Sequence, residues 1–143
     1  MLICDKMDQK NYKNWHPLKS RLNNEPDENR LFFHEREIWY CHLGDNVGSE
    51  EDGQGEYFLR PVIVFKKFNN EIFWGIPLTK SVKRTNTESD KYYYNFSFLP
   101  NLISSAILSQ IRLIDGKRLA RHIGVIEEKY FIELTKKFKG LIP

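Results

Sequence analysis

The feature that most limits the fold of this chain is a succession of short strand-like segments between residues 36 and 114, with no helical pattern between them. The first is "REIWYCHL" (36–43), in which Ile38 and Tyr40 fall on one side of a strand and Trp39 on the other. The later ones, "PVIVFKKF", "EIFWGIPLT", "KYYYNFSF" and "AILSQIRLI", are rich in β-branched and aromatic residues. Such a succession predicts an antiparallel sheet or a small barrel.

Two further signals complete this domain. Asn69 and Asn70 separate two of the strand segments and predict a tight hairpin turn. After the last strand the period changes to that of a helix, and one face comprises Tyr130, Phe131, Leu134 and Phe138. Gly140 is a suitable C-terminal stop for that helix. The fold class is therefore mainly β with a C-terminal helix (α+β).

The first 34 residues differ from the rest. Trp15, Leu18 and Leu22 have the spacing of one helix face, and Pro17 falls inside that pattern, which predicts a short helix or two half-turns. The polar stretch "NNEPDENR" that follows is typical of a linker. We therefore divide the chain into a partly helical N-terminal arm, residues 1–34, and a barrel domain, residues 35–143.

Composition places the chain among globular proteins. Its 143 residues are 41% hydrophobic and 14% aromatic, enough for one domain with a core. No apolar run approaches the length of a membrane span, and charges enter at once in "MLICDKMDQK", so we expect a cytoplasmic protein without a signal peptide. Cys4 and Cys41 form no CxxC motif and are expected to be reduced.

The net charge of +3 is unevenly distributed. Residues 44–58 hold five acids and no lysine or arginine; the acids are Asp45, Glu50, Glu51, Asp52 and Glu56. Residues 103–143 hold eight bases against four acids, and four of the bases lie close together: Arg112, Lys117, Arg118 and Arg121. Such a basic cluster either attracts phosphate or is an ordinary solvated face.

The familiar motifs for metal and nucleotide chemistry are missing. The acidic loop does not fit the calcium template, because Val47 stands where an oxygen ligand is due. The four histidines are scattered, without an HxH or HxxxH pair. "GQG" (53–55) has no third glycine and no following helix, and there is no GK[ST] and no serine elbow. We therefore expect no metal site and no cofactor.

What remains is a pair of polar groups at strand ends. If residues 60–68 and 71–79 form a hairpin, Arg60 and Thr79 face each other at its open end, beside the acidic loop. A guanidinium fork suits a phosphate. The alternatives are a rim salt bridge from Arg60 to Glu50 or Glu56, and a plain strand-end hydroxyl for Thr79.

With these residues assembled, the chain resembles the PemK/MazF family of toxins from bacterial type II toxin–antitoxin pairs. Five blocks occur in the family's order: "REIWYCHLG" (36–44), "VGSE" (47–50), "RPVIV" (60–64), "IPLT" (76–79) and "SAILSQIRLIDGKRLARHIG" (105–124). A helix from about residue 127 to residue 139 closes the pattern. The resemblance covers about residues 35–141, three quarters of the chain.

The resemblance implies an SH3-like small antiparallel barrel that forms a homodimer and is neutralised by a cognate antitoxin protein. It also implies metal-independent, sequence-selective cleavage of single-stranded RNA, often mRNA. In that reaction the 2′-hydroxyl attacks the adjacent phosphate and leaves a 2′,3′-cyclic phosphate. Such chemistry needs a base, a cation on the developing charge and an acid for the leaving oxygen.

Carried over by position, Arg60 matches the RP arginine and would hold the scissile phosphate, and Thr79 matches the PLT threonine and would bind the same phosphate. Glu50 matches the acid after the loop's small residue and is the candidate base. The resemblance further implies a role in RNA binding for Gln110, Ser49, Ser109 and Arg112. For Arg112 the alternative is support of the fold or of the dimer.

The chain also departs from part of the family. Some members have His at the position of Ser49, Asp at Ser109 and Arg at Ile107, so the acid–base trio of that branch is absent. The second hypothesis is therefore a catalytically inactive barrel that binds RNA or a protein partner. Two roles are also open for the arm, a packed extension anchored by Trp15 or a built-in cover of the RNA groove. The loop 80–91 carries four bases and either contacts RNA or is mobile.

Overall fold

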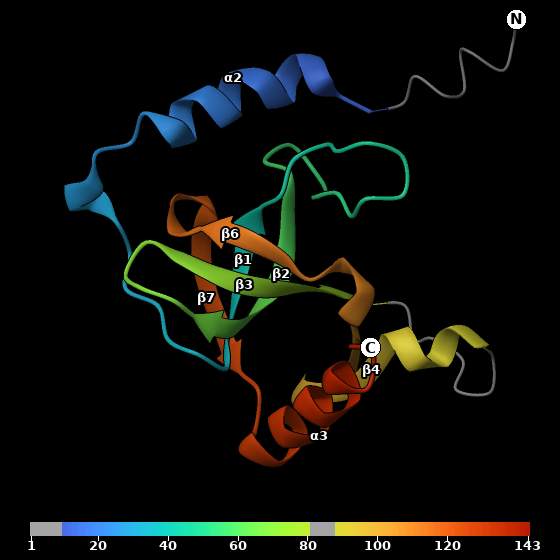
Figure 1. Cartoon of the computed structure of the whole chain (residues 1–143). Helices are drawn as coiled ribbons and strands as arrows, with labels where there is room; N and C mark the ends of the chain where they lie inside the picture. Colours follow the sequence, from blue (N-terminus) through green and yellow to red (C-terminus); the bar gives the residue numbers. More distant parts are fainter. Residues whose placement is uncertain (1–9, 81–87) are drawn as a thin grey trace, which may run out of the picture.

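The computed structural model describes residues 10–80 and 88–143 (Figure 1). The strands are β1 (Glu37–His42), β2 (Leu59–Lys67), β3 (Ile72–Thr79), β4 (Tyr93–Leu99), β5 (Leu102–Ile107), β6 (Arg112–Asp115) and β7 (Leu119–Val125). The α-helices are α2 (Tyr12–Asn23) and α3 (Glu128–Lys139). The short 3-10 helices are η1 (Asp27–Asn29), η2 (Glu88–Tyr92), η3 (Leu108–Gln110) and η4 (Gly116–Arg118). The described helices include none that is both long and apolar enough to cross a membrane.

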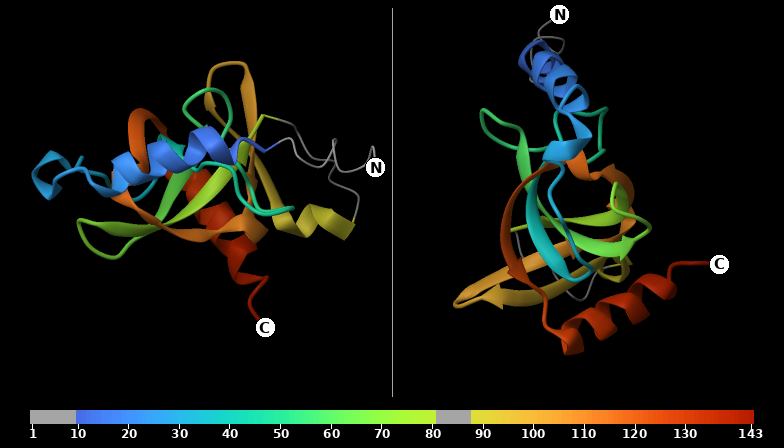
Figure 2. Two further views of the ribbon diagram at one scale, coloured as in Figure 1. Left: turned by 90° about the horizontal axis from the view of Figure 1, so that it is seen from above. Right: turned by 90° about the vertical axis from the view of Figure 1, so that its left-hand side faces the viewer.

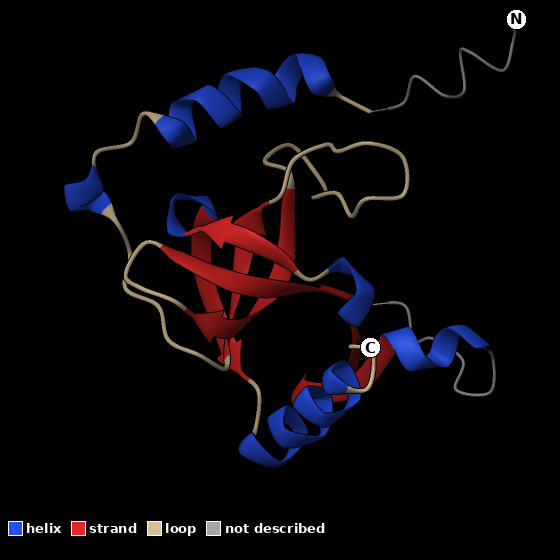
Figure 3. Cartoon of the chain, viewed as in Figure 1, coloured by secondary structure: helices blue, strands red, loops and turns tan. Residues whose placement is uncertain are grey.

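The strands form one curled antiparallel sheet, which makes a half-barrel (Figure 3). Its order is β4-β5-β3-β2-β1-β7, and β6 pairs with a second part of β3. The mainly β, α+β fold class is confirmed. The sheet curls because β3 pairs with β5 near its C-terminal end and with β6 near its N-terminal end.

The alternation read from β1 separates two hydrophobic clusters on opposite faces of the sheet. Trp39 and Cys41 belong to the first cluster, with Phe73, while Ile38 belongs to the second, with Ile63. Cys41 is a free thiol, and burial raises its pKa to about 12. It is therefore inert as a nucleophile at neutral pH. Cys4 lies outside the described residues.

The segment "AILSQIRLI", expected as one strand, is two strands joined by η3, and this corrects the prediction. Leu78 pairs with Ala106, whereas Gly75, three residues earlier on β3, pairs with Arg112. Three residues of the returning chain therefore leave the ladder. The alternation of apolar residues continues on both sides of the break, which is why the sequence resembles a single strand. The break moves Gln110 off the sheet.

The β2–β3 hairpin turns where the sequence predicts it. The side-chain oxygen of Asn69 accepts hydrogen bonds from the backbone N–H of Glu71 (2.8 Å) and of Ile72 (3.0 Å). The backbone N–H of Phe68 donates to the carbonyl of Ile72. An asparagine that bonds its own backbone in this way stabilises a tight turn. The register that follows pairs Val62 with Pro77.

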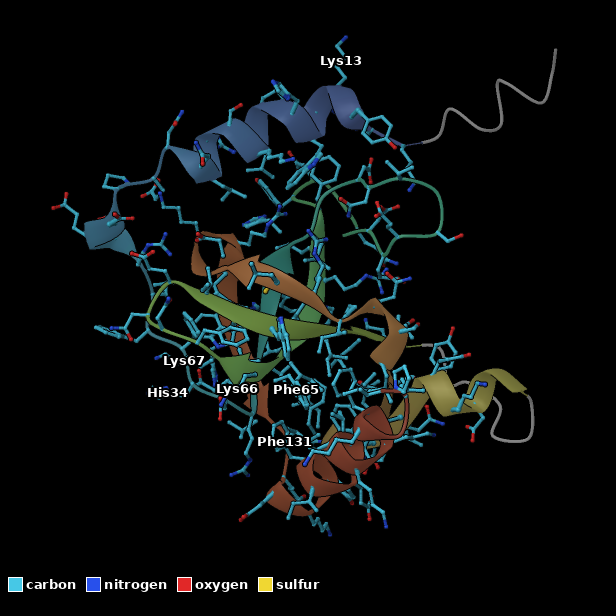
Figure 4. All side chains as sticks on the ribbon, viewed as in Figure 1. Lys13, His34, Phe65, Lys66, Lys67 and Phe131 are labelled. Carbon is cyan, nitrogen blue, oxygen red and sulfur yellow. The ribbon has the colours of Figure 1, made fainter. Side chains whose placement is uncertain are left out.

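Helix α3 packs on the second hydrophobic cluster through the face that the period predicts. Leu134 is fully buried, and Phe131 and Phe138 lie 5.7 Å and 5.2 Å from Phe65 of β2, measured between ring centroids. Phe65 and Phe131 point toward each other from sheet and helix (Figure 4). Gly140 caps the C-terminal end. The helix thus covers the face of the sheet that carries the second hydrophobic cluster.

Of the two expected forms, a short helix or two half-turns, the structure has the helix, which continues through Pro17. Asn11 caps its N-terminus by accepting from the backbone N–H of Asn14 at 3.2 Å. Trp15 and Leu18 are buried against Phe58, in a third hydrophobic cluster. Tertiary packing therefore outweighs the hydrogen bond that proline removes.

Gly44 sets how closely the arm approaches the domain. A Cβ at Gly44 would lie 2.0 Å from a Trp15 ring carbon, and its φ is +78°. At Gly48, with φ +55°, a Cβ would meet no atom within 4 Å. Gly44→Ala is therefore expected to displace α2, whereas Gly48→Ala adds only backbone strain of about 1 kcal/mol.

Limited proteolysis and tryptophan fluorescence measure this difference. We expect α2 of Gly44→Ala to be cut at least about tenfold faster than that of Gly48→Ala, which corresponds to about 1.4 kcal/mol more of local opening. Equal cutting of the two variants would contradict the contact between Trp15 and Gly44.

Candidate functional site

Arg60 lies at the start of β2, opposite Cys41 of β1, and is only 7% exposed. Its Nη1 donates to the carbonyl of Leu78 on β3 at 3.0 Å, and its Nε donates to the carbonyl of Asp52. The side chain is therefore fixed between the rim of the sheet and the acidic loop. A buried guanidinium held in one orientation suits the recognition of a planar oxyanion.

The third nitrogen of that guanidinium binds a carboxylate. Nη2 of Arg60 lies 2.8 Å from Oε1 of Glu51, so the expected rim salt bridge exists, but its acid is Glu51 rather than Glu50 or Glu56. Glu50 is exposed and accepts from the backbone N–H of Val47 at 3.0 Å. The loop turns between these neighbours, so that only one of them points at Arg60.

Thr79 ends β3, where it pairs with Ser105 of β5. It borders the same cavity as Arg60. The structure thus brings both residues to one rim, as the hairpin register predicts. Val62 pairs with Pro77, and two residues from this pair toward the open end of the hairpin lie Arg60 on β2 and Thr79 on β3. A threonine hydroxyl and a guanidinium on one cavity wall offer donors to a shared anion.

Gln110 reaches the acidic loop from η3. Its Nε2 donates to the carbonyl of Ser49 at 3.0 Å, and its Oε1 accepts from the backbone N–H of Glu51 at 3.2 Å. The side-chain amide therefore fixes the loop beside Arg60. Ser109 is exposed on the same turn. Arg112 lies apart on β6, opposite Gly75.

The N-terminal arm binds the other side of this loop (Figure 1). Tyr12 Oη donates to the carbonyl of Asn46 at 2.8 Å, and Lys10 lies 3.2 Å from a carboxylate oxygen of Asp52. The backbone N–H of Asn11 donates to the carboxylate of Asp45. The acidic loop is thus held between the arm and Arg60, and four of its five acids have partners within the chain.

The basic cluster of the sequence divides in space. Lys117 donates to the carbonyl of Asn23 at 3.0 Å, and Arg118 donates to the carbonyl of His42 at 3.0 Å. Burial lowers the pKa of Arg118. Lys117 thus links the arm to the barrel, as does Arg118, whose guanidinium lies 5.7 Å from the ring centroid of Trp15. Arg121 lies along β7 at the edge of the cavity.

The cavity next to Arg60 has a volume of about 920 Å³. It lies between the β1–β2–β7 face and the β4–β5 hairpin. Arg60, Lys80 and Arg121 line it, and none of the aspartates and glutamates within residues 10–80 and 88–143 does. Such a lining favours an anionic ligand.

A metal centre finds no support in the part of the chain that the structure describes. Within residues 10–80 and 88–143, no group of three or more His, Cys, Asp or Glu side chains could hold an ion. The acids of the loop are spread among separate partners within the chain.

A comparison with protein families gives one match for this chain. The family model described as PemK-like, MazF-like toxin of type II toxin–antitoxin system matches residues 34–142. The chain belongs to this toxin family. The resemblance read from five sequence blocks is thereby confirmed. A comparison with curated proteins found no match. The toxins of this family act beside an antitoxin, and they are generally endoribonucleases.

For this family member, residue types alone missed two parts of the site. Glu51 was counted as one loop acid among five, and Lys10 and Tyr12 of the arm were not singled out. Only the folded loop separates Glu51 from Glu50, because it turns the Glu51 carboxylate to Arg60 and the Glu50 carboxylate to the backbone N–H of Val47. For the arm, the signal was the aromatic Tyr12 three residues before Trp15, on the same helix face.

Proposed function

We propose that this protein is a metal-independent, sequence-selective endoribonuclease that cleaves single-stranded RNA, including mRNA. The observation that carries the proposal is Arg60, a buried guanidinium that already binds an oxyanion, the carboxylate of Glu51, at the mouth of a positively charged cavity. Membership of the toxin family supports the same reaction class.

The reaction needs only groups of the RNA and of the protein. The 2′-oxygen loses its proton and attacks the neighbouring phosphorus, while the bond from phosphorus to the 5′-oxygen breaks. The leaving 5′-oxygen takes up a proton. The products are a 2′,3′-cyclic phosphate and a 5′-hydroxyl, and no net oxidation or added water is required.

In this proposal Arg60 and Thr79 stabilise the charge that develops on the phosphate oxygens, and Arg60 supplies a proton donor near the leaving oxygen. Glu50 stays the proposed base, with a carboxylate that is exposed to incoming RNA. Gln110 and the loop residue it holds, Ser49, are proposed to contact bases beside the cut. Ser109 and Arg112 are proposed as further RNA contacts.

Glu51 must leave Arg60 before phosphate can bind there. A carboxylate and a phosphate compete for one guanidinium fork. The apparent affinity for RNA is therefore the affinity of the open form multiplied by the fraction of molecules whose loop is open. The acidic loop is then a gate that RNA displaces. The negative charge of the loop opposes RNA binding, and while the gate is closed this charge is paired with groups within the chain.

The gate predicts that Glu51→Gln lowers the KM for RNA by about threefold to tenfold, because the amide competes less strongly for Arg60. Glu56→Gln is the matched control, since it removes an exposed acid of the same loop that forms no ion pair with another described residue. Steady-state cleavage of a labelled RNA gives both constants. Equal effects of the two variants would contradict the gate, and a fall in kcat only for Glu51→Gln would assign the base to Glu51.

The activity itself is tested with purified protein and mixed single-stranded RNA in EDTA. We expect discrete fragments that end in 2′,3′-cyclic phosphate, and sequencing of the ends gives the recognition sequence. No fragments across varied RNA sequences would contradict the proposal. We further propose that the protein acts in the cytoplasm as a homodimer and that its cognate antitoxin covers the RNA-binding groove.

One observation favours a second function, an inactive barrel that binds RNA or a protein partner. All three nitrogens of the Arg60 guanidinium have acceptors within the chain. A permanently closed loop would leave the phosphate without its cation. Salt-dependent RNA binding without any product would favour this function over cleavage.

A further inference from the structure

The N-terminal arm has no part in the proposed reaction, yet it is bound to the loop that carries Glu51. Helix α2 lies at the end of the barrel opposite α3, next to the acidic loop (Figure 2). Trp15 packs on Phe58, where the loop ends, with ring centroids 5.3 Å apart. The arm is therefore a fixed part of the folded domain, and its first residues are placed to act on the loop.

Asn46 is the point of the loop at which the donors of the arm meet. Tyr12 Oη donates to the carbonyl of Asn46 at 2.8 Å, and the ammonium of Lys10 donates to the same carbonyl. The backbone N–H of Asn46 donates to a carboxylate oxygen of Asp52 at 2.6 Å, and its side-chain amide donates to the carbonyl of Glu51 at 2.9 Å. The arm thus holds the two sides of the loop through one residue that binds both.

Asp52 connects the arm directly to Arg60. Its carboxylate lies 3.2 Å from the ammonium of Lys10, and its backbone carbonyl accepts from Nε of Arg60. The neighbouring Glu51 binds Nη2 of the same guanidinium. Two of the three acceptors of Arg60 therefore belong to the part of the loop that the arm holds, and the third, the carbonyl of Leu78, belongs to the sheet.

This division of partners determines what Arg60 gains when the loop moves. The bond to the carbonyl of Leu78 would keep the guanidinium in place on the sheet. Nε and Nη2 would both lose their acceptors, and these two nitrogens form one edge of the guanidinium. Two parallel donors on one edge bind two oxygens of a phosphate in bidentate fashion.

The donors of Lys10 indicate that the arm holds the loop rather than RNA. A lysine ammonium has three N–H donors. In Lys10 they have the carbonyls of Asn46 and Gly48 and the carboxylate of Asp52 as acceptors. Lys13 is different, because it is exposed and points away from the barrel (Figure 4). It forms no ion pair or hydrogen bond with another described residue, which makes it a matched control.

We propose that Lys10 and Tyr12 are positioning residues for the candidate site. They hold Asn46 and Asp52, which keeps Glu51 and the carbonyl of Asp52 on the phosphate-binding edge of Arg60. The contacts of the arm thereby set the fraction of molecules whose loop is open, and the arm controls RNA binding without covering the groove. The proposal rests on the proposed function, because it concerns when the same Arg60 can bind phosphate.

The first test needs no RNA and uses the full chain. Hydrogen exchange of peptides from residues 44–56 is compared between wild type and a variant with both Lys10→Gln and Tyr12→Phe. We expect the loop of this arm variant to exchange at least about threefold faster, because it opens more often. Lys13→Gln is expected to exchange like wild type, and circular dichroism shows that each variant is folded.

The second test measures binding and cleavage. The binding probe is a fluorescent, all-2′-deoxy single strand of mixed sequence, which cannot be cut because it lacks the nucleophile. We expect the arm variant to lower the Kd of this probe and the KM for RNA by about threefold, with kcat changed less than twofold. Lys10→Arg keeps the charge and the donors, and it is expected to restore the wild-type KM when Tyr12 is intact.

A double-mutant cycle tests whether the arm acts through Glu51. When Glu51→Gln has already weakened the contact with Arg60, the arm substitutions are expected to lower KM by less than about 1.5-fold further. A full threefold effect in that background would mean that the two changes are independent, and it would overturn the proposed route from the arm to Arg60.

The positioning role and the reaction fail in different ways. If wild type cuts RNA while the arm variant keeps the wild-type loop exchange and KM, the positioning role is wrong and the endoribonuclease proposal stands. If the arm variant exchanges faster and binds the deoxy probe more tightly but no RNA is ever cut, the positioning role stands and the proposed reaction fails. Weaker probe binding in both the arm variant and Lys13→Gln would overturn the positioning role, since it indicates direct contact between the arm and nucleic acid.

Discussion

Arg60→Ala is expected to lower the rate of RNA cleavage by about a hundredfold or more. The guanidinium would stabilise charge that exists only in the transition state, and loss of one such preorganised donor costs roughly 3 kcal/mol. Single-turnover cleavage at saturating protein measures the effect on the chemical step. Thr79→Ala is expected to lose at least about tenfold in the same assay, because a neutral hydroxyl donates a weaker bond than a cation.

Controls separate this chemistry from folding. Arg60 also holds the acidic loop through Asp52 and Glu51, so its removal is expected to lower the melting temperature. Arg60→Lys keeps the charge and loses the fork, and we expect it to stay well below wild type in rate. Arg21→Ala, on the exposed face of α2, is expected to cut like wild type. Cleavage by Arg60→Ala at the wild-type rate would contradict the proposed site.

Leu134→Ala is expected to lower the free energy of unfolding by about 2–5 kcal/mol. Leu134 is fully buried where α3 packs on the sheet, and shortening it removes apolar contacts and leaves a cavity. Ile132 lies on the same helix and is 60% exposed. Ile132→Ala is therefore expected to change the free energy of unfolding by less than about 1 kcal/mol.

Urea denaturation, followed by circular dichroism, measures both variants under one set of conditions. The comparison tests whether α3 is part of the cooperative core, as its contacts with Phe65 indicate. Similar losses for the two variants would mean that α3 contributes through helix formation alone. Because α3 is far from the loop at residues 44–58, neither substitution is expected to change KM for RNA in the folded protein.

The acidic loop shows where prediction from sequence succeeds and where it stops. Its mismatch with the calcium template is visible in the sequence, because calcium loops need oxygen ligands at fixed spacings and Val47 interrupts them. Its contact with Arg60 could also be predicted, since a hairpin fixes which strand ends are neighbours. The choice of Glu51 over Glu50 could not, because two adjacent side chains of a loop differ only in backbone direction.

The sheet gives a similar comparison. The alternation in β1 and the turn at Asn69 were predicted from local pattern and are confirmed, as is the face of α3. The break at η3 was missed, because a three-residue insertion into a strand leaves the apolar pattern on both sides intact. That break decides the site, since it carries Gln110 to the loop.

The sequence by itself determined the mainly β fold class with its C-terminal helix, the toxin family and the position of Arg60 and Thr79 at one rim of the hairpin. These depend on local periodicity, turn chemistry and motif order, all of which are properties of short segments. Tertiary structure alone decided that Glu51 binds Arg60 and that the arm binds the acidic loop. It also decided the cavity lined by Tyr40 and Ser104. Each of these joins residues from distant segments, and their contacts form only when the sheet curls and brings those segments together.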